Sequence, residues 1–436
     1  MKKQHTNPRS AAAAASLIAW EKNGRYANLE VAAFLADSPL SEADRALYTA
    51  LVYGVIERVI TLDHIIAGLS SRPLSEIDRE ALCALRLGIY QLTFMDRIPP
   101  HAAVSESVNT APSRSRGFVN ALLRSYLRGG CQYSLPEGDP MARMSVEFSA
   151  PVELCQFWCQ RYGDGLTAHL LTSTTRNPSV TLRVNPLRTS AENVVAEFPE
   201  GDASLCPLAP DMVTVKSAAH ITDGIGAGKY FVQDPASRLC VKVLDPQPGE
   251  TVIDTCAAPG GKTLSAALDM GNEGRLIAFD LHENKLSLIR RTAASLGISI
   301  LEVQARDARN PDPALIGMAD RVLCDAPCSG LGVIGKKPDI KYKSLGSIRA
   351  LPGIQYDILC GAAEYVRPGG TLVYSTCTLN PDENEHIVTR FLMEHPDFTA
   401  VDFDLGPAGG SRDGMRTFYP HLDGCDGFFI AKMVRS

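Results

Sequence analysis

No two of the 12 cysteines are spaced as Cys-x-x-Cys in this sequence of 436 residues. Zinc ribbons and zinc fingers hold their metal with such pairs, so the spacing excludes them, and we predict no metal site. Scattered cysteines in a chain of this length also differ from the dense framework of a small disulfide-rich domain. The cysteines therefore indicate a reducing compartment, and we predict a cytoplasmic protein.

Long apolar runs are absent as well, because none approaches the ~20 residues that a membrane-spanning helix needs. The stretch Ala11–Trp20 follows basic residues and has the length of a short signal peptide. It is mostly alanine, a strong helix former of weak apolar character, and it continues into Glu21 and Lys22. We therefore predict that this stretch is the first helix and that the protein does not associate with a membrane.

The chain also lacks an overall excess of positive charge. Lys and Arg number 43 against 49 Asp and Glu, and the net charge of −6 excludes a protein that is basic throughout. Residues 1–130 carry 15 basic against 12 acidic side chains, whereas the remainder carries 28 against 37. This modest asymmetry fits a nucleic-acid-binding face in the first part, and it fits chance surface charge equally well.

Residues 1–130 show helical patterns. Two segments begin with Ser-x-x-Asp, which resembles a capping box, at Ser41 and at Ser75. Apolar residues then recur every three or four positions, which predicts helices with a buried stripe. These positions are Leu47, Leu51, Val55, Val59 and Leu62, then Leu82, Leu85, Ile89 and Leu92, and in a third segment Val119, Leu122, Leu123, Tyr126 and Leu127. We predict an all-α domain over residues 1–130.

A linker follows, indicated by Gly129-Gly130 and by the stretch Pro136–Pro140. Residues 142–235 combine a predicted helix, Val152–Tyr162, with strand-like stretches at Val180–Val184 and Met212–Val215. This mixture predicts a small α+β segment between two larger domains.

Residues 236–436 alternate between strand and helix patterns. The candidate strands are Thr251–Asp254, Arg275–Phe279, Ile300–Gln304, Arg321–Cys324 and Thr371–Ser375. Continuous apolar strands separated by helices predict an α/β, Rossmann-like domain with a mainly parallel sheet covered on both faces. Ligands bind such a sheet at the carboxyl ends of its strands, where the notable motifs of this chain fall.

The first strand-to-helix turn of this domain reads Cys256-Ala-Ala-Pro-Gly-Gly-Lys262. Its small residues let the backbone approach a ligand closely, and the following helix offers free N–H groups. The turn has neither the Walker A pattern nor Gly-x-Gly-x-x-Gly. Asp280 ends the second strand, where a carboxylate accepts from ribose hydroxyls, and Asp307 follows the third, where it can accept from an adenine amino group. Together they predict an adenosine cofactor, whereas either acid alone can be a helix cap or a surface charge.

Two cysteines follow adjacent strand ends, in Asp325-Ala-Pro-Cys328 and in Ser375-Thr-Cys377. A thiolate that adds to carbon-6 of cytosine turns the ring into an enamine, and its carbon-5 can then attack a methyl sulfonium. Such a reaction needs a nucleophilic cysteine, a base, and an acid or donor near ring nitrogen-3. Cys328, Cys377 and Asp325 supply these types, and Lys262 is a candidate cation to lower a thiol pKa. The other cysteines are interpreted as small buried hydrophobes.

Three blocks together resemble the RNA 5-methylcytosine methyltransferases of the NOL/NOP/Sun family: Asp254–Thr263, Asp325–Gly332 and Ser375–Asn384. The tail Gly424–Ala431 is similar to the last strand motif of that family. The N-terminal region resembles a NusB-like domain in Arg86–Gln91, Asp96–Val104 and Gly117–Arg124. The resemblance extends over nearly the whole chain, and its motifs are specific.

The resemblance implies a monomeric, S-adenosylmethionine-dependent enzyme that methylates carbon-5 of one cytosine in 16S rRNA. It makes Cys377 the nucleophile, with Cys328 assisting proton removal and product release. It implies a cofactor site made of Cys256, Ala257, Ala258, Pro259, Gly260, Gly261, Lys262, Asp280, Asp307 and Asp325.

RNA contacts are also implied. Residues 142–235 would be an RNA-facing extension that includes Arg183–Asn185 and Gln233–Ser237. The NusB-like domain would bind RNA, and its candidate phosphate contacts are Arg9, Lys22, Arg25, Arg114, Arg116, Arg124 and Arg128. Each of these side chains fits a solvated helix face equally well.

Other functions stay open at this point. A DNA cytosine methyltransferase would use Cys328 as its nucleophile, whereas the second cysteine, Cys377, favours the RNA class. Amino-methyltransferases usually carry Asp/Asn-Pro-Pro-Tyr where this chain has Asp325-Ala-Pro-Cys328. A tRNA or another RNA is an alternative substrate. A NusB-like binding module with an inactive methyltransferase domain is the alternative of a different class, and the full set of site residues argues against it.

Overall fold

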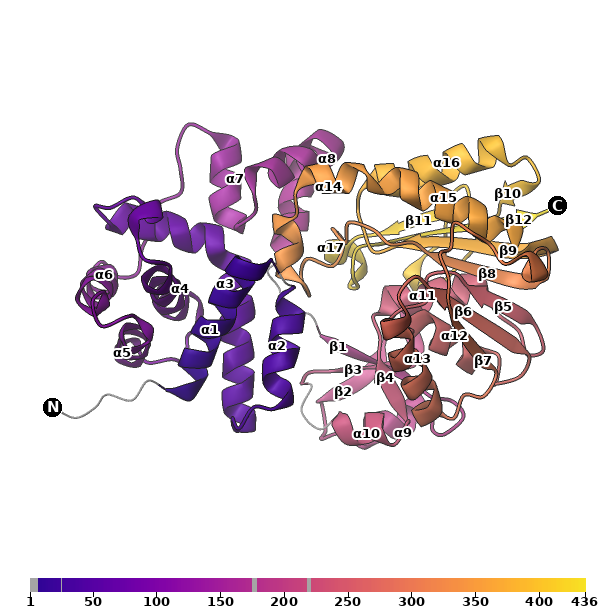
Figure 1. Cartoon of the computed structure of the whole chain (residues 1–436), viewed down its shortest axis with the longest axis horizontal. Helices are drawn as coiled ribbons and strands as arrows, with labels where there is room; N and C mark the ends of the chain where they lie inside the picture. Colours follow the sequence, from indigo (N-terminus) through magenta and orange to yellow (C-terminus); the bar gives the residue numbers. More distant parts are fainter. Residues whose placement is uncertain (1–6, 25, 175–178, 218–220) are drawn as a thin grey trace. The chain divides into compact units, whose positions relative to one another are not determined.

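The structure, a computed structural model, describes residues 7–24, 26–174, 179–217 and 221–436 (Figure 1). The chain divides into two compact units. Unit 1 comprises Met1–Arg176 together with Lys336–Lys343, and unit 2 comprises Asn177–Gly335 together with Ser344–Ser436. Among the described residues, none of the helices combines the length and the apolar character that a bilayer crossing requires.

Unit 1 is helical, as the sequence predicts. Most of the predicted stripe positions, such as Leu51, Leu85 and Leu123, are buried in one hydrophobic core. The α-helices of this unit are α1 (Pro8–Asn23), α2 (Ala27–Ala36), α3 (Glu42–Leu69), α4 (Arg79–Phe94), α5 (Pro100–Thr110), α6 (Arg116–Arg128), α7 (Pro140–Phe148) and α8 (Val152–Ser173). Two 3-10 helices accompany them, η1 (Leu74–Glu76) and η3 (Pro338–Tyr342).

The two predicted capping boxes have different outcomes. Ser41 caps α3 as predicted, because its Oγ accepts a hydrogen bond from the Asp44 N–H at 3.2 Å. The prediction at Ser75 is wrong, since this residue lies in η1 and α4 begins only after Asp78. The Asp78 carboxylate accepts hydrogen bonds from Arg114 and Ser115 instead. A capping pattern compares residues a few positions apart, so it cannot predict partners this far along the chain.

Unit 2 begins with a small antiparallel sheet in the order β2-β3-β1-β4. Its strands are β1 (Val180–Val184), β2 (Ala203–Cys206), β3 (Ala209–Val215) and β4 (Tyr230–Val232), accompanied by α9 (Ala191–Ala196) and α10 (Thr222–Gly226). The predicted strand Val180–Val184 is reproduced residue for residue. Leu182, Val184, Val213 and Tyr230 form its buried core with α9.

The larger sheet of unit 2 has the order β10-β12-β9-β8-β5-β6-β7, with β11 paired to β12. Strands β9, β8, β5, β6 and β7 run parallel, and β12 is antiparallel to β9. The strands are β5 (Thr251–Asp254), β6 (Arg275–Asp280), β7 (Leu301–Ala305), β8 (Ala319–Asp325), β9 (Val366–Thr376), β10 (Phe398–Ala400), β11 (Met415–Phe418) and β12 (Phe428–Arg435). The prediction of a mainly parallel, Rossmann-like sheet is confirmed.

Helices cover both faces of this sheet (Figure 1). Apolar residues of α11, α12 and α13 pack on one face with Val252, Leu276 and Val373. Residues of α15 and α16 pack on the other with Ile253 and Ile277, because alternate residues of a strand face opposite ways. The α-helices are α11 (Pro235–Leu244), α12 (Gly261–Asp269), α13 (Glu283–Leu296), α14 (Leu345–Arg349), α15 (Leu351–Glu364), α16 (Glu385–Glu394) and α17 (Pro420–Asp423). Three 3-10 helices complete the unit, η2 (Pro313–Leu315), η4 (Pro381–Glu383) and η5 (Gly406–Ala408).

The division of the chain differs from the predicted segments 1–130, 142–235 and 236–436. Helix α8, which contains the helix predicted in the middle segment, belongs to unit 1 together with α7, and the small sheet belongs to unit 2. The segment Lys336–Lys343 joins unit 1 from within the predicted third domain. Hydrophobic patterns along the chain report local structure, so they do not show which core a segment joins.

Candidate active site

The candidate site residues gather at one edge of the large sheet because they follow the carboxyl ends of parallel strands. Strand β5 ends at Asp254, β6 at Asp280 and β8 at Asp325. Strands β8 and β9 are direct neighbours, so the turns that follow them lie side by side. These turns carry Cys328 and Cys377, the two cysteines singled out in the sequence.

The two thiols lie within contact distance of each other. The Cys328 and Cys377 sulfur atoms are 3.1 Å apart, and both residues are half-buried. The Gly332 N–H donates to the Cys377 carbonyl at 3.0 Å, which ties the two turns together. A side chain at Gly332 would collide with the Gly427 carbonyl, so this close approach needs glycine. The pKa of Cys328 is raised by its hydrogen bond to Cys377 and by burial.

A half-buried ion pair lies beside the thiols. Lys262 Nζ is 2.6 Å from Asp325 Oδ2, and the Ser375 hydroxyl donates to Asp325 Oδ1 at 2.8 Å. Burial disfavours the charged ammonium, but the attraction of Asp325 and of the neighbouring thiols together outweighs it and raises the pKa of Lys262. A negative charge on Cys377 adds to this attraction, so Lys262 favours a thiolate there in return.

The predicted cofactor turn joins β5 to α12. Gly260 precedes the helix with φ of 109°, a conformation that glycine adopts readily. The Ala257 N–H donates to the Phe279 carbonyl at 2.7 Å, and the Ala258 N–H donates to Asp280 Oδ2 at 3.2 Å. The turn is therefore fixed against the end of β6, with the N-terminal N–H groups of α12 beside it.

Asp307 lies apart from the thiols, after β7, the strand next to β6. Its carboxylate accepts hydrogen bonds from Arg309, which lower its pKa. A turn rich in N–H groups, followed by acids after the next two strands, is a donor and acceptor set that suits an adenosine with a charged tail. The residues present thus fit S-adenosylmethionine.

Two buried acids at the site, Asp254 and Glu383, were not among the site residues predicted from the sequence. Asp254 is 2% exposed and accepts hydrogen bonds from the Thr263 hydroxyl and the Cys256 N–H. Glu383, in η4, is 0% exposed. Both lie inside motif blocks quoted for the family resemblance, so position within these blocks was the available signal.

The residues expected to face RNA in the middle segment are buried instead. Arg183, Asn185 and Gln233 are 3%, 0% and 5% exposed. Asn185 donates to the carbonyls of Gly228 and Leu296, and Gln233 donates to the Gly261 carbonyl at 2.9 Å. The expectation that these side chains contact RNA is wrong, because they attach the small sheet to the cofactor turn and the helices beside it.

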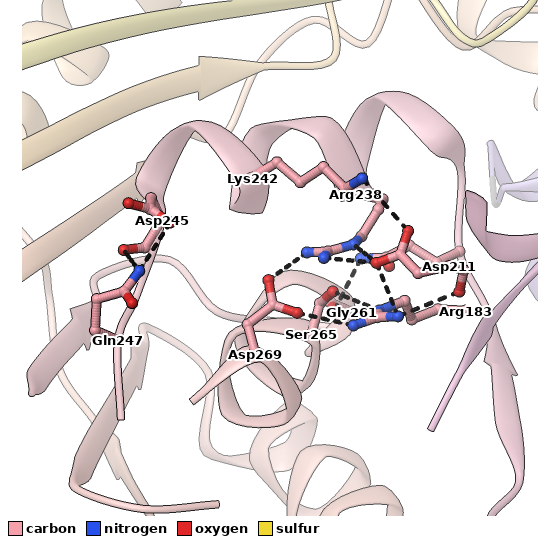
Figure 2. A network of polar contacts seen from close by, with 10 residues as sticks. Arg183, Asp211, Arg238, Lys242, Asp245, Gln247, Gly261, Ser265 and Asp269 are labelled. Atoms are coloured by element: carbon pink, nitrogen blue, oxygen red, sulfur yellow. Dashed lines mark hydrogen bonds and ion pairs between the residues drawn. The ribbon is translucent and has the colours of Figure 1, made fainter. Parts of the chain in front are cut away.

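Figure 2 shows the polar network that completes this attachment. Arg183 and Arg238 lie between two carboxylates, Asp211 of β3 and Asp269 at the end of α12. Arg183 also donates to the Ser265 hydroxyl. Lys242 adds a longer contact to Asp211, at 3.6 Å. The network therefore joins α12 to both the small sheet and α11.

The candidate phosphate contacts of unit 1 differ in what their side chains touch. Arg9 and Arg114 form ion pairs with acidic side chains of the same unit. Arg116 donates to the carbonyls of Asn109 and Ala111. Lys22, Arg124 and Arg128 are exposed. Arg25 lies outside the described residues.

Comparison with known proteins places the chain in a family. The family model of the 16S rRNA methyltransferase RsmB/F matches residues 241–434, and that of the NusB family matches residues 6–128. The probable ribosomal RNA small subunit methyltransferase B of Bacillus subtilis is 37% identical over 433 residues, which are 96% of each protein. The chain belongs to the RsmB/F family of 16S rRNA methyltransferases.

Other relatives agree with this membership. The ribosomal RNA small subunit methyltransferase B of Sodalis glossinidius is 34% identical over 91% of each protein. The crystal structure of PH0851 superposes with a TM-score of 0.80 at 28% identity, over 99% of this chain and 100% of that one. The family resemblance, the NusB-like domain and the fold class predicted from the sequence are confirmed. The predicted cofactor, S-adenosylmethionine, is that of this methyltransferase family.

Proposed function

We propose that the protein methylates carbon-5 of one cytosine in 16S rRNA through a covalent bond between Cys377 and carbon-6. One observation carries this proposal: two thiols lie 3.1 Å apart at the ends of neighbouring strands, beside the Lys262–Asp325 pair. A single cysteine can be structural, but two half-buried thiols in turns at a ligand-binding edge favour chemistry. The matches to rRNA methyltransferases support an RNA substrate.

The reaction needs a nucleophile at carbon-6 because carbon-5 of cytosine is a weak nucleophile. The Cys377 thiolate adds to carbon-6, and the displaced ring electrons make carbon-5 able to accept a methyl group. The carbon-5 proton then leaves, the bond between sulfur and carbon-6 breaks, and the ring double bond returns. Lys262 stabilises the attacking thiolate, and Asp325 is the candidate partner for the nitrogen-3 edge of the ring.

S-adenosylmethionine, when bound, supplies the methyl group as a sulfonium. The residues that would hold it are the turn Cys256–Lys262 with Asp280, Asp307 and Asp325. Cys328 is assigned to the second half of the reaction, in which it assists proton removal and the departure of the Cys377 sulfur. The target base would have to leave its stack, because stacking hides the face of carbon-6.

Unit 1 is proposed to bind the RNA. Its match to the NusB family supports this role, and the exposed side chains Lys22, Arg124 and Arg128 are the candidate phosphate contacts. Arg9 and Arg114 are weaker candidates, because acidic side chains already pair with them. A monomer in the cytoplasm acting on rRNA is the simplest arrangement for such a site.

The test is transfer of labelled methyl groups to unmodified 16S rRNA, with bisulfite mapping of the product. We expect one methylated cytosine with the wild type, none with Cys377→Ala, and a trapped protein–RNA adduct with Cys328→Ala. Cys360→Ala, which changes a half-buried cysteine of α15, is the matched control and should be fully active.

Activity that survives in Cys377→Ala would refute the nucleophile assignment. Transfer to tRNA but not to 16S rRNA would keep the chemistry and replace the substrate. Absence of transfer to any RNA, together with intact RNA binding, would favour a binding module with an inactive methyltransferase domain.

A further inference from the structure

Glu383 is a fully buried acid behind the two thiols. Burying a carboxylate without hydrogen-bond partners costs free energy, so the contacts of Glu383 indicate its role. Oε2 accepts hydrogen bonds from the Ser329 N–H at 2.8 Å and from Gln355 Nε2 at 2.9 Å. Oε1 accepts from Asn380 Nδ2 at 3.0 Å. None of these three donors carries a positive charge, so the carboxylate is solvated by neutral groups.

The three donors come from the segments that carry the thiols. Ser329 directly follows Cys328, and Asn380 lies three residues after Cys377. Gln355 of α15 donates both to Glu383 and to the Pro327 carbonyl, which precedes Cys328. Glu383 therefore connects the Cys328 turn, the Cys377 turn and the helix behind them.

A second contact repeats this connection. The Ser329 and Thr378 hydroxyls, each next to one of the cysteines, are 2.7 Å apart. Glu383 thus fixes the backbone of Ser329, the residue after Cys328. The Thr378 hydroxyl, from the residue after Cys377, fixes the side chain of Ser329. The separation of the two sulfur atoms follows from these contacts.

The surrounding charges are unequal for the two thiols. The titratable groups that act on Cys328 are Cys377, Glu383, Asp325 and Tyr374. Its hydrogen bond to Cys377 raises the pKa of Cys328 most, followed by burial, and the charge of Glu383 adds to the effect. Cys377 has the attraction of Lys262 among its neighbouring charges. In the protein without substrate, these charges favour placing a proton shared by the pair on Cys328.

We propose that Glu383 is a positioning residue that holds the two cysteine turns together and keeps the shared proton on Cys328, so that Cys377 carries the thiolate. This assignment rests on the proposed function, in which Cys377 is the nucleophile. Glu383 itself need not touch substrate or cofactor, because it acts through the Ser329 and Asn380 contacts.

Glutamine is the informative replacement, because it keeps the size of the side chain and removes its charge. All three partners of Glu383 are donors, and a glutamine can offer only one acceptor oxygen to them. Glu383→Asp keeps the charge and shortens the side chain. Comparing the two variants therefore separates the effect of the negative charge from the effect of side-chain length.

The experiment measures the alkylation of Cys328 in the full-length Cys377→Ala protein, without RNA or cofactor. Iodoacetamide labelling is followed from pH 6 to pH 10, and mass spectrometry quantifies the peptide that contains Cys328. Glu383→Gln should move the midpoint of reactivity about one pH unit lower. Glu383→Asp should retain the original midpoint.

Asp382→Asn is the matched control, since it removes the same charge one residue away from a side chain that is 44% exposed. It should leave the midpoint unchanged. The contrary result is that Glu383→Gln alkylates Cys328 faster at every pH while keeping the midpoint of the Cys377→Ala protein in which Glu383 is intact. That result would show a purely structural role of Glu383 and overturn the proposal.

Methyl transfer gives the second readout. In the otherwise wild-type protein, Glu383→Gln should lower kcat about 100-fold with little change in the affinity for S-adenosylmethionine. The alkylation result does not depend on methyl transfer, so failure of the proposed function and failure of the Glu383 assignment can be told apart.

Discussion

Three acidic residues at the site differ in the partners that surround their carboxylates. Asp325 has a cation, Lys262, and Glu383 has three neutral donors. Among the described residues, the hydrogen-bond donors to Asp254 are the Thr263 hydroxyl and one backbone N–H, although Asp254 is 2% exposed. Burial therefore raises the pKa of Asp254 to about 7. The protonation of Asp254 should therefore change near neutral pH.

This shift predicts a dependence of stability on pH. The unfolded state has an ordinary Asp pKa, so between about pH 4 and pH 7 the folded state holds the extra proton. Stability should fall as pH rises through this window, by at most about 4 kcal/mol, and the loss is complete above pH 7. Asp254→Asn should remove this slope, which urea unfolding followed by circular dichroism at pH 4.5, 6 and 8 would measure.

The control is Asp413→Asn, because the Asp413 side chain is 83% exposed. It should retain the wild-type slope. Asn can accept from Thr263 but also places an amide against the Cys256 N–H, so Asp254→Asn can carry a constant penalty at all pH values. Only the slope decides, and an unchanged slope would contradict the prediction.

At the scale of elements, helix α12 depends on the network shown in Figure 2. A carboxylate at a helix C-terminus is unfavourable by itself, and Arg183 and Arg238 compensate Asp269. The side chains of Arg183 and Arg238 are 3% and 6% exposed, so neither can turn to water when a carboxylate is lost. The network is therefore more sensitive to the loss of an acid than an exposed ion pair would be.

Asp269→Asn should lower the free energy of unfolding of unit 2 by about 3–5 kcal/mol, because it leaves two buried cations with one carboxylate. It should also weaken binding of S-adenosylmethionine in calorimetric titration, since α12 carries the cofactor turn. Lys242→Ala removes a contact of the same network whose side chain is 32% exposed, and should cost about 1 kcal/mol or less. If Asp269→Asn and Lys242→Ala lower the free energy of unfolding equally, the buried acid is no more important to the network than the more exposed lysine, and the prediction is wrong.

Elements with strong local signals were predictable. Strands β1 and β5 have the predicted bounds, because their apolar runs are short and flanked by turn residues. A strand in the tail, observed as β12, follows from the family resemblance of Gly424–Ala431, whereas its antiparallel direction was not predicted. The start of α4 was misplaced, since Asp78 is held by Arg114 and Ser115, 36 and 37 residues away.

The candidate site was predictable in part for the same reason. Strand ends in a parallel sheet converge, so Asp325, Cys328 and Cys377 could be expected together from their positions after strands. The pairing of Lys262 with Asp325 and the burial of Arg183 depend on side chains far apart in the sequence. A motif block shows that Glu383 is present but does not show that it faces the Cys328 turn.

For the whole molecule, the discontinuity of unit 1 is the main feature that patterns along the chain did not predict. The segment Lys336–Lys343 interrupts unit 2 and belongs to unit 1. Its Tyr342 hydroxyl donates to the Ile56 carbonyl at 2.7 Å, and its ring lies 5.8 Å from that of Trp20. Lys341 is 3% exposed and donates to the Glu57 carbonyl. Unit 1 thus includes a segment that lies, along the chain, between two parts of unit 2.

Both tryptophans of the chain, Trp20 and Trp158, lie in unit 1, so tryptophan fluorescence reports the unfolding of that unit alone. Tyr342→Phe removes the hydroxyl that donates to the Ile56 carbonyl and should lower the free energy of unfolding seen by fluorescence by about 1–3 kcal/mol. Tyr133→Phe changes a tyrosine of the same unit that is 37% exposed and should stay within about 0.5 kcal/mol of wild type. If the two variants unfold alike, the segment is only attached to unit 1 and does not stabilise it. A selective loss in Tyr342→Phe would mean that the stability of the NusB-like unit depends on a segment supplied from within the methyltransferase domain.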